Sequence, residues 1–521
     1  PARRRAASLR LNASCPFGQQ IAIERVNAPS LSGGNELRQR DEHSGCAHHS
    51  FWISPPMNSA CWKLSAVDLA TLVRERQISA IEATQSVLAR IHDVNPRINA
   101  LAEVMSDQAL ATASAADQAL ASGVPIGPLH GVPVTIKVNV DTVGHATTDG
   151  VVAFKDHMAT SDSPLVASLR AAGAIIVGRS NTPALSVRWF TDNDLHGRTL
   201  NPFNAGVTPG GSSGGAAAAV ACGMGAIAHG NDYGGSVRYP AWACGVVGLR
   251  TTAGRIPSYQ ATAPDRTISL QQMSVQGPLT RTVADARLAL QVMAQGSALD
   301  PQWVPAPLEY ADSAHPVKVA LFRHHPAYAA DPSVLAALDQ AAAWLKAAGY
   351  EVEEAVPPHF EEACALWRHQ VAEDTRSGQS DIERYADAAS RAMLQGCLYG
   401  LPKWDAAQVL EGQVRRFNIA RDWSVFLEKY PVLLMPNSWE KQFPIDDDQR
   451  GQDRLEQMVR AQSPLLCTAM LGLPGLSVPT GMTQGLPQGV QLVSTRFRED
   501  RLLRAGEVIE QAANFQALAH C

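Results

Sequence analysis

The chain has 521 residues, of which 45% are hydrophobic and 18% are charged. Lysine and arginine number 44 against 49 aspartate and glutamate residues, so the formal net charge is −5. These values are typical of a globular protein with a large core, and they argue against nucleic acid as its main partner.

Residues 1–56 differ from the rest of the chain. They open with PARRRAASLR, carry 7 basic and 4 acidic residues, and show little apolar periodicity. An arginine-rich, serine-containing start is typical of a transit peptide, but the acidic residues argue against one. We therefore predict a disordered or non-native extension that the folded body does not need, followed by a single domain over residues 57–521.

Beyond this extension, helical and strand patterns alternate. Ser65 and Ser79 each stand three residues before an acid, which predicts helices over 66–76 and 80–94, the second ending before Pro96. Further helices are predicted over 106–122, 164–172, 333–348 and 501–513, and strands over 132–137, 174–178, 317–322, 350–355, 432–436 and 476–479. The alternation predicts an α/β fold, with a large mixed, mostly parallel sheet covered by helices on both faces. The stretch at about 300–465 is more irregular, and we expect it to supply the walls of a substrate pocket.

The cysteines and the uncharged segments indicate where in the cell the protein is expected and whether it crosses a membrane. Nine cysteines are scattered along the chain, and no CxxC pair occurs. This pattern predicts a reducing compartment without a disulfide framework, and hence a cytoplasmic protein. The longest uncharged stretch, 199–231, is rich in Gly, Ala and Ser and contains two prolines, so it is predicted to be buried rather than to cross a membrane. We expect no membrane contact, and a monomer or homodimer.

Two clusters rich in glycine and serine carry the strongest chemical signal. Residues 209–216 read PGGSSGGA and residues 231–238 read NDYGGSVR, and 24 residues separate Ser212 from Ser236. Glycines let backbone N–H groups approach a ligand closely. The second cluster therefore predicts an oxyanion hole or another anion site.

A serine nucleophile needs a base, and two arrangements compete. The pattern Gly211-x-Ser213-x-Gly215 is that of the nucleophile elbow in Ser-His α/β-hydrolases such as esterases, but the preceding NPFNAGVTPG is not a strand pattern. In the other arrangement the base is Lys137, at the end of the apolar strand VPVTIK, where burial would favour the neutral amine. A lysine at the end of a strand can also simply point to solvent.

Five motifs, in this order, resemble those of the amidase signature family. They are GVPVTIK (131–137), GGSSGGAAAAVACG (210–223), DYGGSVRYPAWACGVVGLR (232–250), PGLSVP (474–479) and GLPQGVQLV (485–493). The resemblance extends from about Leu64 to the end of the chain. It implies the family's α/β fold and an amidohydrolase that works through an acyl-enzyme, without a metal or another cofactor.

The resemblance also implies roles for single residues. Ser236 would be the acylated nucleophile, Ser212, preceded by a cis peptide bond, would relay the proton, and Lys137 would be the base. Ser213 would hydrogen-bond and orient Lys137.

Further residues are implied to support this triad. The oxyanion would be held by backbone N–H groups of Tyr233, Gly234, Gly235 and Ser236. Asp232 and Arg238 would brace the loop around the nucleophile. Trp189 and Phe190 are candidates for an apolar substrate pocket, although core packing explains them equally well.

The sequence departs from the family pattern at two positions. Val138 follows the lysine where many members have Asp, and Ala184 stands where Glu is common. Neither position belongs to the implied triad. The loss of these two acids makes the surroundings of the lysine less polar or marks a subgroup.

The substrate that the resemblance implies is a small or medium uncharged amide, for example an anilide, a carbamate or a cyclic amide. The alternative within the family is a glutaminase-like subunit of a multi-protein amidotransferase. The alternative outside it is the Ser-His esterase.

Overall fold

Short apolar strands form one mixed sheet in the part of the chain that the computed structural model describes, which is residues 60–311, 316–515, 518–519 and 521. The strands are β1 (Leu101–Val104), β2 (Pro133–Lys137), β3 (Ile175–Ser180), β4 (Ile227–Asp232), β5 (Val247–Arg250), β6 (Val275–Thr280), β7 (Lys318–Leu321), β8 (Glu351–Glu354), β9 (Val432–Met435), β10 (Gly475–Thr483) and β11 (Leu486–Val493). Their order in the sheet is β1-β3-β2-β4-β6-β5-β10-β11-β9-β7-β8. Pairing is parallel between β2 and its neighbours and between β7 and its neighbours, and antiparallel elsewhere.

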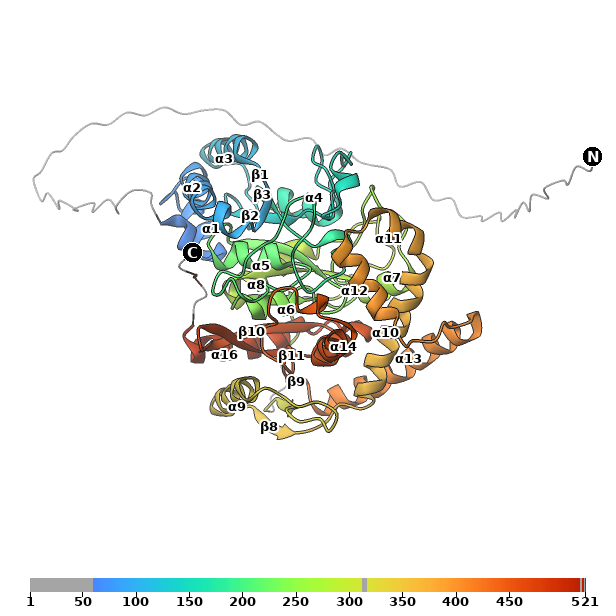
Figure 1. The fold of residues 1–521 in the computed structure, drawn as a ribbon. Coiled ribbons are helices and arrows are strands. Elements are labelled where there is room, and N and C mark those ends of the chain that lie inside the picture. Colours follow the sequence, from blue (N-terminus) through green and yellow to red (C-terminus); the bar gives the residue numbers. More distant parts are fainter. Residues whose placement is uncertain (1–59, 312–315, 516–517, 520) are drawn as a thin grey trace, which may run out of the picture. The chain divides into compact units, whose positions relative to one another are not determined.

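Helices are packed around this sheet (Figure 1). They are α1 (Ala66–Arg74), α2 (Ala80–Ile98), α3 (Ser106–Ala121), α4 (Pro164–Ala171), α5 (Gly214–Ala221), α6 (Arg238–Ala243), α7 (Ile268–Met273), α8 (Val283–Met293), α9 (Pro332–Ala347), α10 (Phe360–Ser377), α11 (Gln379–Tyr385), α12 (Ala388–Leu398), α13 (Ala406–Lys429), α14 (Gln452–Ala461), α15 (Ser463–Met470) and α16 (Glu499–Ala513). Each predicted helix and strand is present, and the predicted α/β fold with a large mixed sheet is confirmed. The predicted extension, residues 1–56, lies outside the described residues.

Both faces of the sheet are buried, as strand β9 illustrates. Val432 and Leu434 belong to one apolar core cluster, together with residues of α8, α9 and α16. Leu433 and Met435 belong to another, together with residues of α10, α13 and α15. Successive side chains of a strand point to opposite faces, so the two clusters lie on opposite sides of the sheet.

The first helices follow their capping signals, with one correction. The side chains of Ser65 and Ser79 both accept a backbone hydrogen bond from the residue three positions on, as predicted. Helix α2, however, does not end before Pro96 but continues to Ile98. Ile98 is buried and extends the apolar stripe of this helix, so packing outweighs the proline in its last turn. Asn99, in the left-handed conformation, ends the helix.

The region at about 300–465 is mostly helical rather than irregular, which corrects the prediction. Helices α9 to α14 fall in it, and α13 alone has 24 residues. Along α13, Leu410, Val414, Phe417 and Val425 are between 63% and 68% exposed, in addition to the residues that this helix buries. Apolar side chains on two faces obscure the helical period that would have revealed the helix in the sequence.

One disulfide is present, whereas the cysteine pattern predicted a chain without a disulfide framework. Cys222 and Cys521 are bonded across 299 residues of sequence. The end of the described chain returns to α5, where Ala519 N donates to Ala221 O at 2.9 Å and Arg90 Nη2 donates to Ala519 O at 3.3 Å. Cysteine spacing carries no information about such a distant pairing. The reducing compartment that was inferred from this spacing therefore loses its support.

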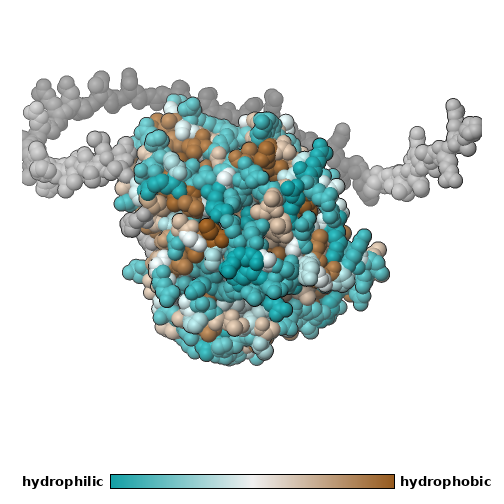
Figure 2. Space-filling view, in the orientation of Figure 1, coloured by the Kyte–Doolittle hydropathy of each residue, from teal (hydrophilic) through white to brown (hydrophobic). Residues whose placement is uncertain are grey.

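Among the described residues, no helix is long and apolar enough to cross a bilayer. On the face seen in Figure 2, hydrophilic residues predominate and apolar residues form separate patches.

Candidate active site

Lys137 ends β2, a strand whose five residues are all buried. Its Nζ donates to Ser212 Oγ at 2.6 Å and to Asn231 Oδ1 at 2.8 Å, so it does not point to solvent. Burial lowers the pKa of Lys137 to about 7, although the carboxylates of Asp149 and Asp232 act to raise it. A neutral amine is therefore available near neutral pH.

Ser212 lies just before α5, in a segment that is fully packed. The Gly211–Ser212 peptide bond is cis, as predicted. Only glycine fits at the preceding position, because a Cβ on Gly211 would lie 2.4 Å from the carbonyl oxygen of Arg188. Ser212 itself is 1% exposed, and its hydroxyl is held between the strand that carries the lysine and the pocket.

Ser213 does not make the predicted bond to Lys137. Its Oγ donates to the carbonyl oxygen of Asn231 at 3.4 Å, and the described residues include no bond from Ser213 to the lysine. The second partner of the lysine is instead the Asn231 side chain. Asn231 was not singled out from the sequence, although it is the first residue of the second cluster, 231–238. Ser213 still joins the two clusters, because its backbone N–H donates to Ser236 O at 3.2 Å.

The loop between β4 and α6 is organised by one buried carboxylate, as predicted. Asp232 receives Arg238 Nε and Nη2, both at 2.9 Å, and Arg250 Nη1 at 3.0 Å, together with the backbone N–H groups of Gly235 and Val237. Burial alone would raise the pKa of Asp232, but the charges of Arg238 and Arg250 outweigh it and hold this pKa well below its ordinary value. Arg250, at the end of β5, was not singled out from the sequence.

The same loop leaves three of the four predicted oxyanion donors unengaged. Within the described residues, no hydrogen bond is made by the backbone N–H groups of Tyr233, Gly234 and Ser236. Gly235 is a correction, because its N–H is taken by Asp232.

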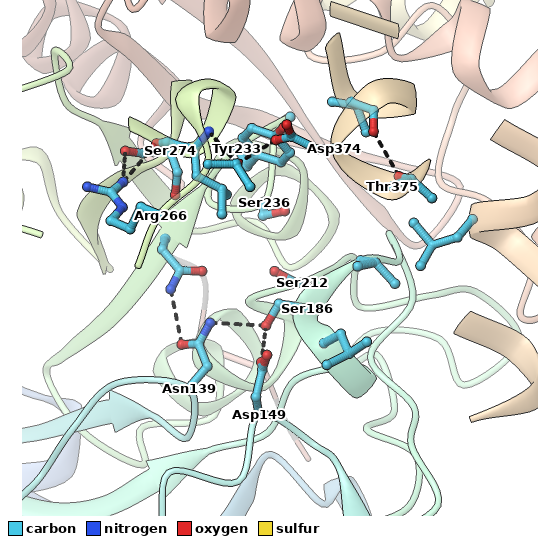
Figure 3. Close-up of a pocket in the computed structure, with 18 of the residues that line it drawn as sticks. Asn139, Asp149, Ser186, Ser212, Tyr233, Ser236, Arg266, Ser274, Asp374 and Thr375 are labelled. Carbon is cyan, nitrogen blue, oxygen red and sulfur yellow. Dashed lines mark hydrogen bonds between the residues drawn. The ribbon is translucent and has the colours of Figure 1, made fainter. Parts of the chain in front are cut away.

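A pocket with a volume of about 420 Å³ opens above these groups. In Figure 3, Ser212 and Ser236 lie in its middle, between Asn139 and Asp149 on one side and Arg266 on the other. Its apolar lining includes Leu185, Trp189, Trp367, Val371, Met393 and Leu394.

Of the two candidate aromatic residues, one lines the pocket and the other does not. Trp189 lines it, and its Nε1 donates to Gly234 O at 3.1 Å. Phe190 is a core residue, and its ring stacks on Phe443 with a centroid distance of 6.3 Å. The expected contribution of the 300–465 region is also present, since α10 and α12 supply much of the apolar wall.

The two departures from the family pattern are both buried apolar positions. Val138 and Ala184 are 2% and 1% exposed, and neither lines the pocket. An acid does line the pocket together with Asn139 and Ser212, namely Asp149. Asp149 was not singled out from the sequence. Burial raises the pKa of Asp149 to about 6, against the opposing effects of a hydrogen bond from Ser186 and the charge of Lys137.

No histidine lines the pocket within the described part of the chain, which argues against a Ser-His esterase. His229, on β4, bonds through Nε2 to Gln276 Oε1 at 2.8 Å, and burial lowers the pKa of His229 to about 3. The described residues also contain no group of three or more His, Cys, Asp or Glu side chains that could hold a metal ion.

Comparison with known proteins extends these observations. The family described as Amidase matches residues 82–503. An indoleacetamide hydrolase of Bradyrhizobium diazoefficiens is 42% identical over 88% of this chain and 88% of that protein. A glutamyl-tRNA(Gln) amidotransferase subunit of Moorella thermoacetica is 34% identical over 87% of this chain and 97% of that protein. The structure of a bacterial aryl acylamidase of the amidase signature family aligns with a TM-score of 0.75 and 26% identity, covering 87% of this chain and 96% of that one.

The fold, the pocket and these matches define a class of enzyme: the protein is an amidase, a hydrolase that cleaves the C–N bond of amides. The chain belongs to the amidase signature family, as its motifs predicted.

Proposed function

We propose that the protein hydrolyses uncharged primary amides of arylacetic acids, through an acyl-enzyme on Ser236. The observation that carries this proposal is the 2.6 Å hydrogen bond between Lys137 Nζ and Ser212 Oγ, at the base of a pocket that Ser236 also lines. A buried lysine on one strand cannot easily reach both the nucleophile and the leaving group, whereas a hydroxyl between them can accept and donate in turn.

In the first half of the reaction, neutral Lys137 accepts the Ser212 proton while Ser212 accepts that of Ser236. Ser236 Oγ then bonds to the amide carbon, and the carbonyl becomes an oxyanion, for which the unengaged N–H groups of Tyr233, Gly234 and Ser236 are the candidate donors. Collapse breaks the C–N bond, and the leaving nitrogen takes a proton from Lys137 through Ser212. Water hydrolyses the acyl-enzyme by the same relay.

The walls of the pocket support an aromatic acyl group. Trp189 and Trp367 form part of its lining, and Met393 and Leu394 contribute to an apolar surface that an aryl ring would cover. The 42% identical relative is an indoleacetamide hydrolase, which is consistent with such a substrate. Anilides, carbamates and cyclic amides form the wider set of uncharged substrates.

A comparison of indole-3-acetamide and phenylacetamide with acetamide tests the substrate. Burial of the ring should raise kcat/KM by about 30-fold or more over acetamide, since a buried aromatic side chain is worth about 2–3 kcal/mol. Leu394→Ala should reduce this preference. Leu398→Ala, on the same helix but outside the pocket lining, should not. Equal rates on acetamide and the aryl amides would contradict the proposal.

The second candidate is the glutaminase-like subunit, which the 34% identical relative favours. Glutamine carries a carboxylate that needs a cationic partner. Of the two arginines that line the pocket in the described part of the chain, Arg188 is paired with Asp448 at 2.7 Å, whereas Arg266 donates to backbone carbonyls and is the cation left to meet such a carboxylate. Hydrolysis of glutamine in preference to aryl amides, together with co-purifying partner chains, would favour this candidate.

A cytoplasmic location and a monomeric or homodimeric state remain predictions.

A further inference from the structure

A chain of hydrogen bonds follows the wall of the pocket from Lys137 to Asp149. Lys137 Nζ donates to Asn231 Oδ1 at 2.8 Å, and Asn231 Nδ2 donates to Asn139 Oδ1 at 3.0 Å. Asn139 Nδ2 donates to Ser186 Oγ at 3.0 Å, and Ser186 Oγ donates to Asp149 Oδ1 at 2.6 Å. Figure 3 shows Asn139, Ser186 and Asp149 pointing toward one another. All four bonds run in the same direction.

The carboxylate at the end of the chain fixes this direction. An ionised carboxylate only accepts, so the single hydroxyl proton of Ser186 is committed to Asp149. Ser186 Oγ must then accept from the Asn139 amide nitrogen. Asn139 consequently turns its oxygen toward the nitrogen of Asn231, which leaves the Asn231 oxygen facing Lys137.

This direction decides how the lysine presents its amine. A neutral amine has N–H groups and one lone pair. Because Asn231 Oδ1 takes an N–H of Lys137, the lone pair is left for the Ser212 hydroxyl 2.6 Å away. If the chain ran the other way, the Asn231 amide nitrogen would face the amine and compete for that lone pair.

We propose that Asp149 is a positioning residue for Lys137: it anchors this hydrogen-bond chain and thereby orients the lysine toward Ser212. The proposal rests on the proposed role of Lys137 as the base. It adds a residue that touches neither Lys137 nor Ser212, in the wall where the amide group of the substrate would bind.

Asp149 also acts through its charge. Its carboxylate raises the pKa of Lys137 against the effect of burial, while its own pKa is raised to about 6. The two groups therefore titrate as a unit. Removal of the negative charge lets Lys137 lose its proton at a lower pH, so the rise of activity with pH should shift downward.

The other titratable groups around the pair keep their charge near neutral pH. Asp232 stays ionised, because its two arginine partners hold its pKa well below the ordinary value. Burial lowers the pKa of His229 to about 3, so His229 is neutral, and burial also lowers the pKa of His196. Arg179 stays cationic, because burial lowers its pKa only to about 10. A midpoint between pH 6 and 8 therefore reports on Lys137 and Asp149.

The test follows the rate at which a fluorophosphonate labels Ser236 in the full-length protein from pH 5 to 9. Asp149→Asn keeps an acceptor for Ser186 but loses the charge, so its midpoint should fall by about half a pH unit or more, with the plateau within about threefold of wild type. Ser186→Ala breaks the chain but leaves the carboxylate in place, so its plateau should fall about tenfold. Asp149→Ala should show both changes.

Asp374→Asn is the matched control, because this carboxylate lines the opposite wall of the pocket, and its midpoint should equal that of wild type. An unchanged midpoint in Asp149→Asn, or an unchanged plateau in Ser186→Ala, overturns the proposal. Thermal unfolding shows whether each variant is folded. If Asp149→Ala is unfolded, Asp149→Asn and Ser186→Ala still decide whether the proposal holds. If the fluorophosphonate labels a residue other than Ser236 in the wild-type protein, the proposed function is overturned instead.

Discussion

Lys137 has no exposed surface, yet its amine is one hydrogen bond away from a pocket-lining hydroxyl. The ammonium form loses its hydration there, which moves the pKa of Lys137 from 10.5 to about 7. A lysine on the surface would be almost entirely protonated at pH 7. The burial of this single residue therefore favours the neutral amine that the proposed mechanism needs as its base.

Activity should accordingly rise with pH around a midpoint near 7, because the neutral amine is the reactive form. Lys137→Met keeps the length of the side chain and removes the amine, so kcat/KM for an aryl amide should fall by about 10³-fold or more. Lys155→Met, at an exposed position, should retain the wild-type profile. Most of the rate surviving in Lys137→Met, or a single His→Ala change abolishing it, would point to a different base.

Ser236→Ala should abolish both turnover and covalent labelling by a fluorophosphonate. Loss of a nucleophile costs about 10⁴-fold or more in rate, and the change removes only one small hydroxyl. Peptide mapping by mass spectrometry locates the label. Ser213→Ala, in the competing GxSxG pattern, should still be labelled on Ser236, and a label on Ser213 in the wild type would rule out the assignment.

At the scale of an element, the β4–α6 loop contains a buried ion cluster of Asp232 with Arg238 and Arg250. Asp232→Asn would leave the buried guanidinium groups of Arg238 and Arg250 without their carboxylate, at a cost of about 3–5 kcal/mol in the free energy of unfolding. The folded pKa of Asp232 lies below the unfolded one, so its stabilisation is complete above about pH 4 and is lost only as the pH falls through the folded value.

Denaturant unfolding of Asp232→Asn measures this cost. The control is Asp339→Asn, which removes an exposed ion pair with Arg323 and should change stability by less than about 1 kcal/mol. Similar losses in the two variants would show that the cluster is not what holds the loop.

Helix α5 is buried along its whole length, and its first two residues are glycines in close contact with their surroundings. A Cβ on Gly215 would lie 2.5 Å from Asn181 N and 2.6 Å from Ala100 O, which are backbone atoms next to the ends of β3 and β1. Gly215→Ala should therefore destabilise the protein by about 3 kcal/mol in thermal or denaturant unfolding. Gly378→Ala, whose Cβ would meet only Asp374 O at 3.6 Å, should be close to neutral, and equal effects would contradict this account.

The elements that could be predicted from the sequence are those with local signals. Ser65 and Ser79 mark helix starts because a cap needs only neighbouring residues, and β2 stands out as a continuous apolar run. The links from Lys137 to Asn231 and Asp149 could not be predicted, because a hydrogen-bond chain that joins β4 to the segments after β2 and β3 depends on how the strands are arranged. That the N–H of Gly235 is not free for an oxyanion could not be predicted either, because only the folded loop shows that it donates to the Asp232 carboxylate.

At the scale of the whole molecule, the Cys222–Cys521 disulfide fastens the end of the chain to the buried helix α5. Because it closes a loop of 299 residues, its removal should destabilise the protein by about 2–4 kcal/mol. Cys521→Ser should lower the melting temperature, and a reductant should lower that of the wild type but not that of the variant. Cys61→Ser, at a free and partly buried thiol, is the control. A melting temperature insensitive to Cys521→Ser would contradict a structural role.

The residues of the proposed triad and the apolar wall of the pocket come from separate stretches of the chain. Lys137, Ser212 and Ser236 belong to segments around β2 and β4, whereas Trp367, Met393 and Leu394 belong to α10 and α12. Selectivity can therefore evolve without disturbing the chemistry. A mutant library over residues 360–398 should yield enzymes with new acyl preferences that still label with a fluorophosphonate, whereas a library over residues 209–238 should yield mostly inactive protein.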